Sequence, residues 1–298
     1  MSGEVSGDVS RAAEELVAEP VTEVCTLHGE GAIWDGTSRL VRFVDLEAGA
    51  LMSYDPATGD VSRRVLGKVA ACVRPRRGGG VVVALERTFV LLDAEGTVEV
   101  EYGPVVDDPG IRFNDGGCDP AGRLWMGSMA YDEAPGRGTV HRLDPDGSVH
   151  LVLSDVTISN GLAFAADGRW ARYVDTPTGR VDTLEVDADA GTITARTPFT
   201  EVRDGSPDGI ALDADGGVWV ALWQGSAVHR YDADGRLTHV VRLPVSQVTS
   251  PTFGGADLAD LYVTTSRRGL PEGREPSAGA LFRVRPGVVG VPVLPFGG

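Results

Sequence analysis

The chain has 298 residues, of which 42% are hydrophobic and 23% are charged, a composition typical of a globular protein. Its formal net charge is −16, from 43 acidic and 27 basic residues, and such a surface repels nucleic-acid phosphates and anionic membranes. No apolar run approaches the roughly 20 residues that are needed to cross a bilayer. We therefore expect neither a nucleic acid nor a membrane as a partner.

The N-terminus is polar and lacks both the basic start and the apolar stretch of a secretory signal. It predicts a tail over residues 1–19, with at most a helical turn at 10–18, and a cytoplasmic protein. Cys25, Cys72 and Cys118 are far apart, so they form neither a disulfide framework nor a zinc spacing. We expect them to be buried or incidental thiols.

One pattern then recurs six times: a polar lead-in, a turn with Asp or Gly, and an apolar strand. In chain order the copies occupy 32–45, 73–85, 116–129, 161–176, 209–222 and 253–266. The centres of their apolar strands align at Phe43, Val82, Trp125, Tyr173, Trp219 and Tyr262. These centres are 39 to 48 residues apart, which is enough chain for about four strands per unit.

Several units also carry a second hairpin, in which Asp and Gly supply the turn between two alternating strands. The clearest of these hairpins lie at 138–153, 179–194 and 226–241. A sandwich or an open barrel would not repeat at this period, whereas a propeller buries each sheet against its neighbours. The sequence therefore predicts an all-β fold, a six-bladed β-propeller that forms one domain over 20–298. Residues 20–28 are the candidate strand for closing the ring.

Polar residues precede the innermost strand of several units, and in a propeller such positions converge at one end of the central channel. They are Glu30, Arg112, Asn114, Asp115, Asn160 and Asp208, with 249–252 as the equivalent region of the last unit. Carboxylate and amide oxygens without histidine suit calcium or magnesium, with manganese and zinc as alternatives. The five histidines are scattered, so we do not expect a three-histidine catalytic zinc site.

Each candidate also has a simpler explanation as part of the scaffold. Residues 159–161 (SNG) and 207–209 (PDG) are good turn sequences, and Arg112 could serve only to pair with Asp115. Glu30 stands between two glycines and is harder to explain as a turn. The occurrence of such residues at equivalent positions in several units favours a site. Trp34, Trp125 and Trp219 are expected in the blade cores.

Six segments carry a resemblance to a known family. They are GEGAIWD (29–35), GGGVVVALER (78–87), RFNDGGCDPAGRLWMGSM (112–129), SNGLAFAADGR (159–169), SPDGIALDADGGVWVALW (206–223) and SPTFGGADLADLYVTTSRR (250–268). Together they make the chain similar to the SMP-30/gluconolactonase family, which includes regucalcin and the luciferin-regenerating enzyme. Residues 129–147 resemble the bacterial sugar-lactonase branch. Met126 and the run 171–174 depart from the family pattern, and neither coincides with a candidate ligand.

The resemblance implies that Glu30, Asn160 and Asp208 are metal ligands and that Arg112 and Asn114 contact substrate oxygens. It implies a metal-dependent lactonase that opens a small sugar lactone with one divalent ion, expected to be calcium, with magnesium, manganese or zinc as alternatives. Asp208 is the expected general base, because a carboxylate beside both ion and water can accept a proton. The alternatives are a phosphotriester hydrolase and a non-catalytic calcium-binding propeller.

Overall fold

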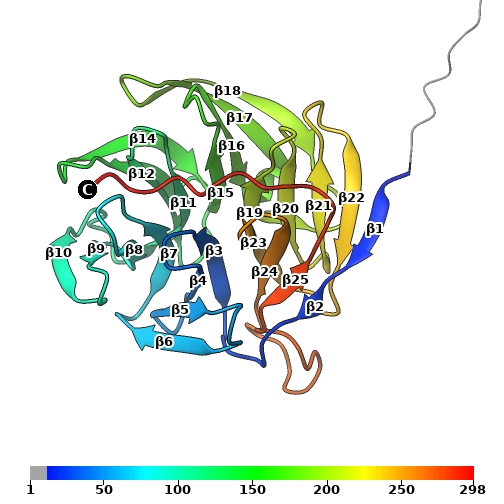
Figure 1. Cartoon of the computed structure of the whole chain (residues 1–298). Helices are drawn as coiled ribbons and strands as arrows, with labels where there is room; N and C mark the ends of the chain where they lie inside the picture. Colours follow the sequence, from blue (N-terminus) through cyan, green and yellow to red (C-terminus); the bar gives the residue numbers. More distant parts are fainter. Residues whose placement is uncertain (1–11) are drawn as a thin grey trace, which may run out of the picture.

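Six sheets stand side by side around a central channel, and apart from two added N-terminal strands their strands are antiparallel and in chain order (Figure 1). The structure is a computed structural model that describes residues 12–298. The first strands of neighbouring sheets contact one another all the way round the ring. The predicted six-bladed β-propeller is therefore confirmed.

Four strands build each of the first three blades. Blade 1 has β3 (Gly29–Asp35), β4 (Leu40–Asp45), β5 (Ala50–Tyr54) and β6 (Val61–Val65). Blade 2 has β7 (Ala70–Pro75), β8 (Val81–Leu85), β9 (Phe89–Leu92) and β10 (Val98–Tyr102). Blade 3 has β11 (Ile111–Cys118), β12 (Leu124–Ala130), β13 (Gly138–Leu143) and β14 (Val149–Val156).

The other three blades follow the same plan. Blade 4 has β15 (Ser159–Phe164), β16 (Trp170–Asp175), β17 (Arg180–Asp187) and β18 (Thr192–Glu201). Blade 5 has β19 (Ser206–Leu212), β20 (Val218–Trp223), β21 (Ala227–Tyr231) and β22 (Leu237–Arg242). Blade 6 has β23 (Val248–Gly254), β24 (Asp260–Thr265) and β25 (Phe282–Val284), and it takes its outer strand from the N-terminus.

The second strand of every blade lies in the core, packed between neighbouring sheets. The six aligned strand centres fall on β4, β8, β12, β16, β20 and β24, so the register predicted from the repeat is confirmed. None of these six side chains is more than 1% exposed. Burial on both faces explains why the centres of these strands are apolar instead of alternating with polar residues.

In two blades, a buried aspartate in the first turn accepts a hydrogen bond from the core tryptophan six residues later. Trp125 donates from Nε1 to Asp119 Oδ2 over 3.0 Å, and Trp219 donates to Asp213 Oδ2 over 2.8 Å. Each tryptophan thereby satisfies its N–H, which a buried indole needs. This pairing gives a structural reason for the Asp-to-Trp spacing that recurs in the sequence repeat.

The N-terminal segment closes the ring, although not with the predicted boundaries. Strand β2 (Glu19–Pro20) pairs with β25 as the outer strand of blade 6, and it overlaps the predicted closing segment 20–28 only at Pro20. Strand β1 (Glu14–Val17) pairs in parallel with β22 and adds a fifth strand to blade 5. The stretch expected to be a tail thus contains a strand, and no helical turn forms in its described part.

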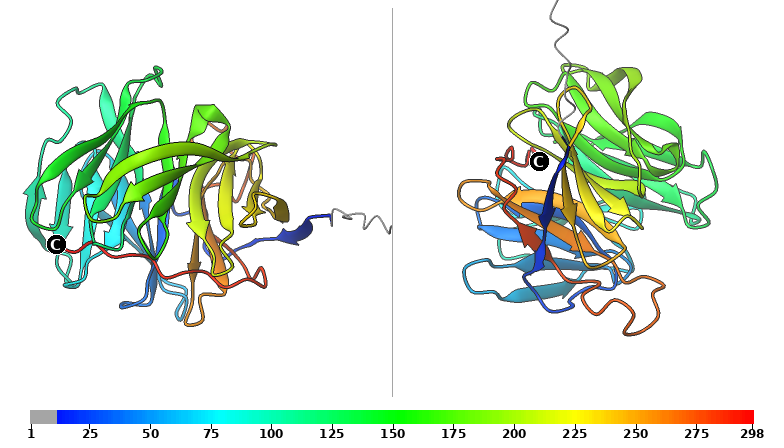
Figure 2. Two further views of the ribbon diagram at one scale, coloured as in Figure 1. Left: turned by 90° about the horizontal axis from the view of Figure 1, so that it is seen from above. Right: turned by 90° about the vertical axis from the view of Figure 1, so that its right-hand side faces the viewer.

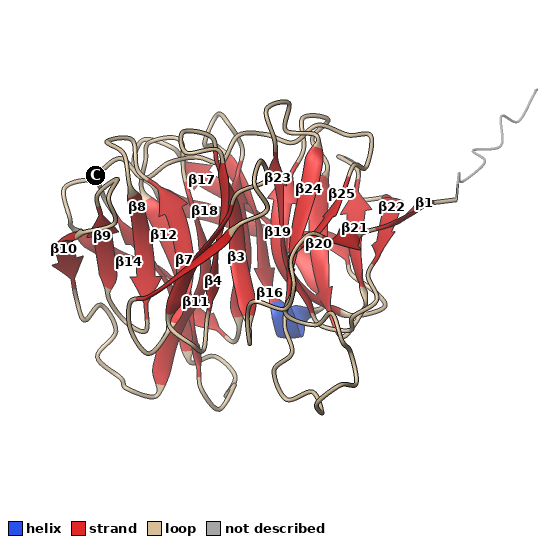
Figure 3. Cartoon of the chain, turned by 60° about the horizontal axis from the view of Figure 1, so that its bottom comes forward, coloured by secondary structure: helices blue, strands red, loops and turns tan. Residues whose placement is uncertain are grey.

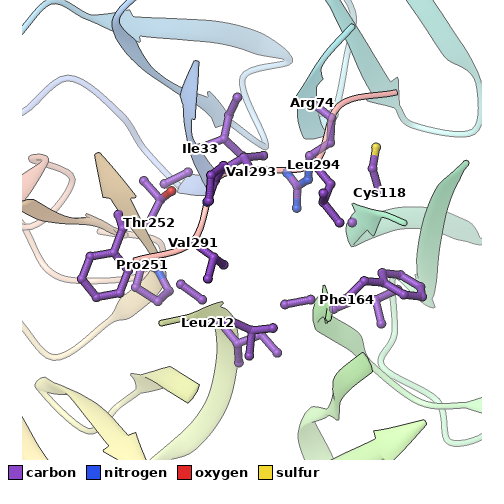
Figure 4. Close-up of a pocket in the computed structure, with 18 residues that line it drawn as sticks. Ile33, Arg74, Cys118, Phe164, Leu212, Pro251, Thr252, Val291, Val293 and Leu294 are labelled. Carbon is purple, nitrogen blue, oxygen red and sulfur yellow. The ribbon is translucent and has the colours of Figure 1, made fainter. Parts of the chain in front are cut away.

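Residues 286–298, which we call the C-terminal strap, cross one end of the channel after β25 (Figures 1 and 2). Phe296 donates its backbone N–H to Pro75 O over 2.8 Å, and its side chain is completely buried. Val291 and Leu294 line a small cavity of about 90 Å³ at this end of the channel (Figure 4). The repeat pattern did not predict this strap.

Helix is nearly absent from residues 12–298, where the one helical element is the 3₁₀ turn η1 (Thr176–Thr178). Figure 3 shows η1 and the C-terminus at opposite ends of the ring. Within this described part of the chain, no helix has the length and apolar character to span a membrane.

Candidate active site

The innermost strand of every blade carries a shift in pairing register near its start. The shifts lie between Glu30 and Ile33, Ala70 and Cys72, Phe113 and Gly116, Ser159 and Leu162, Pro207 and Ile210, and Val248 and Ser250. Such bulges bend a strand and re-aim its side chains, and they are common beside active sites. Asn114, Asn160 and Asp208 occupy the unpaired positions of β11, β15 and β19.

The glycines that follow Asn160 and Asp208 are required by close packing between inner strands. A Cβ at Gly161 would lie 2.9 Å from the carbonyl oxygen of Asp208, and one at Gly209 would lie 2.8 Å from that of Thr249. Both contacts are closer than a real Cβ permits. The turn explanation for SNG and PDG is wrong, because these residues belong to the bulged strands β15 and β19.

Five of the candidate side chains line one cavity of about 450 Å³ at the channel end that contains η1, opposite the C-terminal strap. None is more than 9% exposed. The five are Glu30, Arg112, Asn114, Asn160 and Asp208. The structure therefore brings together, from blades 1, 3, 4 and 5, every residue that the sequence analysis assigned to metal or substrate.

Two other positions raised by the sequence analysis do not line this cavity. Asp115 lies 3.6 Å from Arg74 Nη2 and accepts a 2.7 Å hydrogen bond from Gly116 N, so it does not pair with Arg112. Thr249 donates from its hydroxyl to Gly29 O over 2.6 Å. Thr249 thus joins the last blade to the first, which is a structural role.

The cavity holds two carboxyl groups that both resist ionisation. Burial raises the pKa of Glu30 well above its ordinary range, and the neighbouring Asp208 and Asp115 charges raise it further. Burial also raises the pKa of Asp208, again reinforced by Asp115 and partly offset by hydrogen bonds from Asn160 and Gly209. Like charges in a dry site repel, so a cation between them would stabilise the ionised forms of both.

Two oxygen atoms beside these groups have no hydrogen-bond partner. They are Asn160 Oδ1 and Asp208 Oδ1, and both are fully buried. Leaving buried acceptors unsatisfied costs free energy, so their presence indicates that a ligand completes the site. An amide oxygen and carboxylates from Glu30 and Asp208 are donors that suit a hard divalent cation.

Residues 12–298 contain no group of three or more His, Cys, Asp or Glu side chains arranged to hold a metal. The set formed by Glu30, Asn160 and Asp208 contains two carboxylates and one amide, so it is not a group of that kind. The fit to a cation therefore depends on the oxygen of Asn160 as the third donor, together with solvent or substrate oxygens.

Arg112 is held rigidly on another wall of the cavity. Its Nη1 donates to Asn114 Oδ1 over 2.7 Å and to Phe113 O over 2.9 Å. Asn114 in turn donates from Nδ2 to Ser159 O over 2.9 Å. Burial lowers the pKa of Arg112 from its ordinary value, and the remaining N–H groups of its guanidinium are available to a ligand.

The sequence analysis missed His28, Glu133, Thr176, Trp223 and Arg268, which also line the cavity. His28 Nε2 lies 3.7 Å from Glu30 Oε1, and burial lowers the pKa of His28 to about 3, so its ring is neutral. A signal for His28 existed, because it precedes Glu30 by two residues and alternate strand residues share a face. Thr176 is the last residue of the fourth repeat copy, whereas Glu133, Trp223 and Arg268 lie outside the six copies and had no such signal.

Comparison with known proteins identifies the family. A family model described as the SMP-30/Gluconolactonase/LRE-like region matches residues 28–267. The chain belongs to this family. A relative from Haloferax volcanii, named pentonolactonase XacC, is 38% identical over 285 residues, which cover 93% of this chain and 96% of the relative.

Other family members are similar over nearly their whole length. Human regucalcin is 35% identical over 283 residues, covering 91% of this chain and 95% of the relative. A solved structure of a calcium-binding protein, regucalcin, from Agrobacterium tumefaciens superposes with a TM-score of 0.88 at 28% identity, covering 96% of this chain and 99% of that one. The resemblance found in the sequence motifs is therefore confirmed.

Proposed function

We propose that the protein is a metal-dependent lactonase that opens a small sugar lactone. One observation carries this proposal: two unsatisfied buried oxygens, on Asn160 and Asp208, share a cavity with Glu30 and with the constrained Arg112. A cation site next to a fixed group of hydrogen-bond donors can hold an ester and stabilise charge on it. The relative named pentonolactonase supports a lactone as the substrate class.

Glu30, Asn160 and Asp208 would hold one divalent cation, for which calcium is our first choice and magnesium, manganese and zinc are alternatives. When bound, the ion supplies Lewis-acid stabilisation of the negative charge that develops during ester hydrolysis and makes water a stronger acid. The relative described as a calcium-binding protein supports calcium.

Asp208 acts in this proposal as the general base. It is buried, it lies at the strand bulge that points side chains into the cavity, and its Oδ1 has no protein donor competing for it. It accepts a proton from the attacking water while the new C–O bond forms at the lactone carbonyl. The proton then passes to the ring oxygen as the ester C–O bond breaks, which leaves a hydroxy acid.

Arg112 and Asn114 orient the lactone. Since Arg112 is anchored through Asn114 and the Phe113 carbonyl, its free N–H groups point in fixed directions and can bind substrate hydroxyls without further ordering. A protein that only stored calcium would have no use for this fixed donor group. The arrangement therefore favours turnover over storage.

A screen of sugar lactones against the purified protein tests the proposal, with acid release as the readout, in buffer, in excess chelator, and after adding back calcium, magnesium, manganese or zinc. We expect hydrolysis that chelator abolishes and one of these ions restores. Hydrolysis that is unaffected by chelator would refute the metal dependence. Failure to open any lactone, with calcium binding intact, would support a non-catalytic calcium-binding propeller. Hydrolysis of a phosphotriester and of no lactone would support a phosphotriester hydrolase.

A further inference from the structure

A second, smaller cavity adjoins the candidate active site. Its volume is about 210 Å³, and four residues line both cavities: Arg112, Met129, Glu133 and Arg268. The proposed metal ligands line only the larger cavity. A substrate whose carbonyl faces those ligands has room to extend past Arg112 into the smaller cavity, which we call the side cavity.

Two residues that line the side cavity, Lys68 and Tyr131, belong to a hydrogen-bonded group of three side chains that Glu86 completes. Lys68 Nζ donates to Glu86 Oε1 over 2.8 Å, and the Tyr131 hydroxyl donates to the same oxygen. Lys68 Nζ also lies 5.1 Å from the centre of the Tyr131 ring. These hydrogen bonds lower the pKa of Glu86, so the carboxylate and the ammonium are both ionised at neutral pH.

Two of the cations that line the side cavity, Lys68 and Arg268, are already paired with carboxylates. Lys68 has Glu86, and Arg268 Nε lies 2.6 Å from Glu47 Oε1. An anionic ligand group would have to displace a carboxylate to gain either cation. A neutral hydroxyl fits better, because it can accept from an ammonium and donate to a carboxylate without breaking the pair.

Lys68 is the only lysine in the sequence, in which every other one of the 27 basic side chains is arginine. An ammonium is a compact donor with three hydrogen bonds to give, whereas a guanidinium is a wider planar fork. One of the three is used by Glu86, which leaves two for a ligand. Tyr131 lies on the Arg112 side of this group, with its ring centre 6.0 Å from the guanidinium carbon.

We propose that the side cavity binds the exocyclic hydroxyl-bearing arm of the lactone, and that Lys68 and Tyr131 select substrates that possess this arm. The inference rests on the lactonase function proposed above and narrows its substrate class to lactones with an exocyclic carbon, such as 1,4-lactones of five or more carbons. A four-carbon lactone has the same ring but nothing to place in the side cavity.

Two matched lactones test the proposal. D-Ribono-1,4-lactone carries a hydroxymethyl arm, and D-erythrono-1,4-lactone has the same ring and ring hydroxyls without it. We expect kcat/KM to be about ten-fold higher for the ribonolactone, as one or two net hydrogen bonds allow. Lys68→Met and Tyr131→Phe should each reduce this ratio several-fold, mainly by raising KM for the ribonolactone.

Matched variants away from the site serve as controls. Arg236→Met removes an exposed cation whose partner is Asp234, and Tyr102→Phe removes a hydroxyl on the outer strand of blade 2. Both should keep the wild-type ratio. Equal rates for the two lactones in the wild-type protein, or a ratio unchanged in Lys68→Met and Tyr131→Phe, would overturn the proposal.

A second measurement separates this inference from the lactonase proposal itself. Acylation of Lys68 by an amine-selective reagent can be followed by peptide mass spectrometry, because no other lysine competes. In an Asp208→Asn protein, where we expect the lactone to be consumed far more slowly, ribonolactone should slow acylation and erythronolactone should not. If the wild-type protein hydrolysed no lactone but ribonolactone still protected Lys68, only the lactonase function would be refuted. If ribonolactone gave no protection, the proposed binding of the exocyclic arm in the side cavity would be refuted.

Discussion

Asn160 Nδ2 donates a hydrogen bond to Thr176 Oγ1 over 3.0 Å, and Thr176 donates onward to the Pro207 carbonyl over 2.9 Å. Because a hydroxyl has one proton, its donation to Pro207 obliges it to accept from Asn160. The amide nitrogen therefore faces Thr176, and Asn160 Oδ1 is the atom left without a protein partner. Thr176 thus fixes which end of the amide is offered to a ligand.

Replacing Thr176 with valine keeps the side-chain shape and removes the hydroxyl. We expect calcium affinity to fall about ten-fold, the lower end of what the loss of a group orienting a metal ligand costs. Isothermal titration calorimetry on the metal-stripped protein measures it. Thr200→Val is the control, since its hydroxyl bonds only Gly235 O at the outer edge of blade 4. Unchanged affinity in Thr176→Val would show that the amide needs no such orientation.

Calcium should stabilise the protein more as pH rises. The pKa values of Glu30 and Asp208 are raised in the folded metal-free protein, which therefore binds more protons than the unfolded chain above the ordinary carboxyl pKa of about 4. Stability without metal accordingly falls as pH increases through that window. Calcium displaces these protons and removes the penalty.

Melting temperatures with and without calcium, measured between about pH 5 and pH 8, test this linkage. The calcium-induced increase in Tm should be larger at the upper end of the range. A Glu30→Gln variant, which has one titrating carboxyl fewer, should show a weaker dependence. An increase in Tm that is independent of pH would mean that the two carboxyls are already ionised without metal.

Asp208→Asn should separate metal binding from proton transfer. The variant keeps an oxygen of similar shape and loses charge and basicity, so metal affinity should fall moderately. Lactone turnover at saturating metal should fall much further, by about 10²- to 10⁴-fold, as expected for the loss of a general base. Glu30→Gln is the matched control, which loses a charge and not the base. If excess metal rescued both variants equally, Asp208 would be a ligand only.

The C-terminal strap should matter for stability and not for chemistry. Phe296 is completely buried in the strap, and the C-terminus lies at the end of the ring opposite η1 and the candidate active site. Phe296→Ala should lower the free energy of unfolding by about 3–5 kcal/mol, the usual cost of deleting a buried phenylalanine. Denaturant titration measures the loss, and kcat at 20 °C or below should stay close to that of the wild type. A large decrease in kcat would show that the strap at one end of the channel affects the active site at the other.

The repeat architecture was readable from the sequence because each blade uses the same local chemistry. A buried second strand needs apolar residues on both faces, and the turn before it needs Asp or Gly. Trp125 and Trp219 therefore occupy equivalent positions in their blades, each following such a turn. The N-terminal strands were misplaced because β1 and β2 carry little apolar signal. They form by pairing with β22 and β25, whose edges come from the far end of the chain.

The sequence by itself determined the blade number, the family, and five of the side chains that line the main cavity, since these follow from motifs repeated once per blade. Only the tertiary structure decided that Asn160 and Asp208 sit at strand bulges instead of turns, and that Arg112 is fixed by Asn114. It alone placed His28, Lys68 and Tyr131 beside the site. Those contacts join residues from separate blades, and closing the ring brings them together although nothing local in the sequence encodes their proximity.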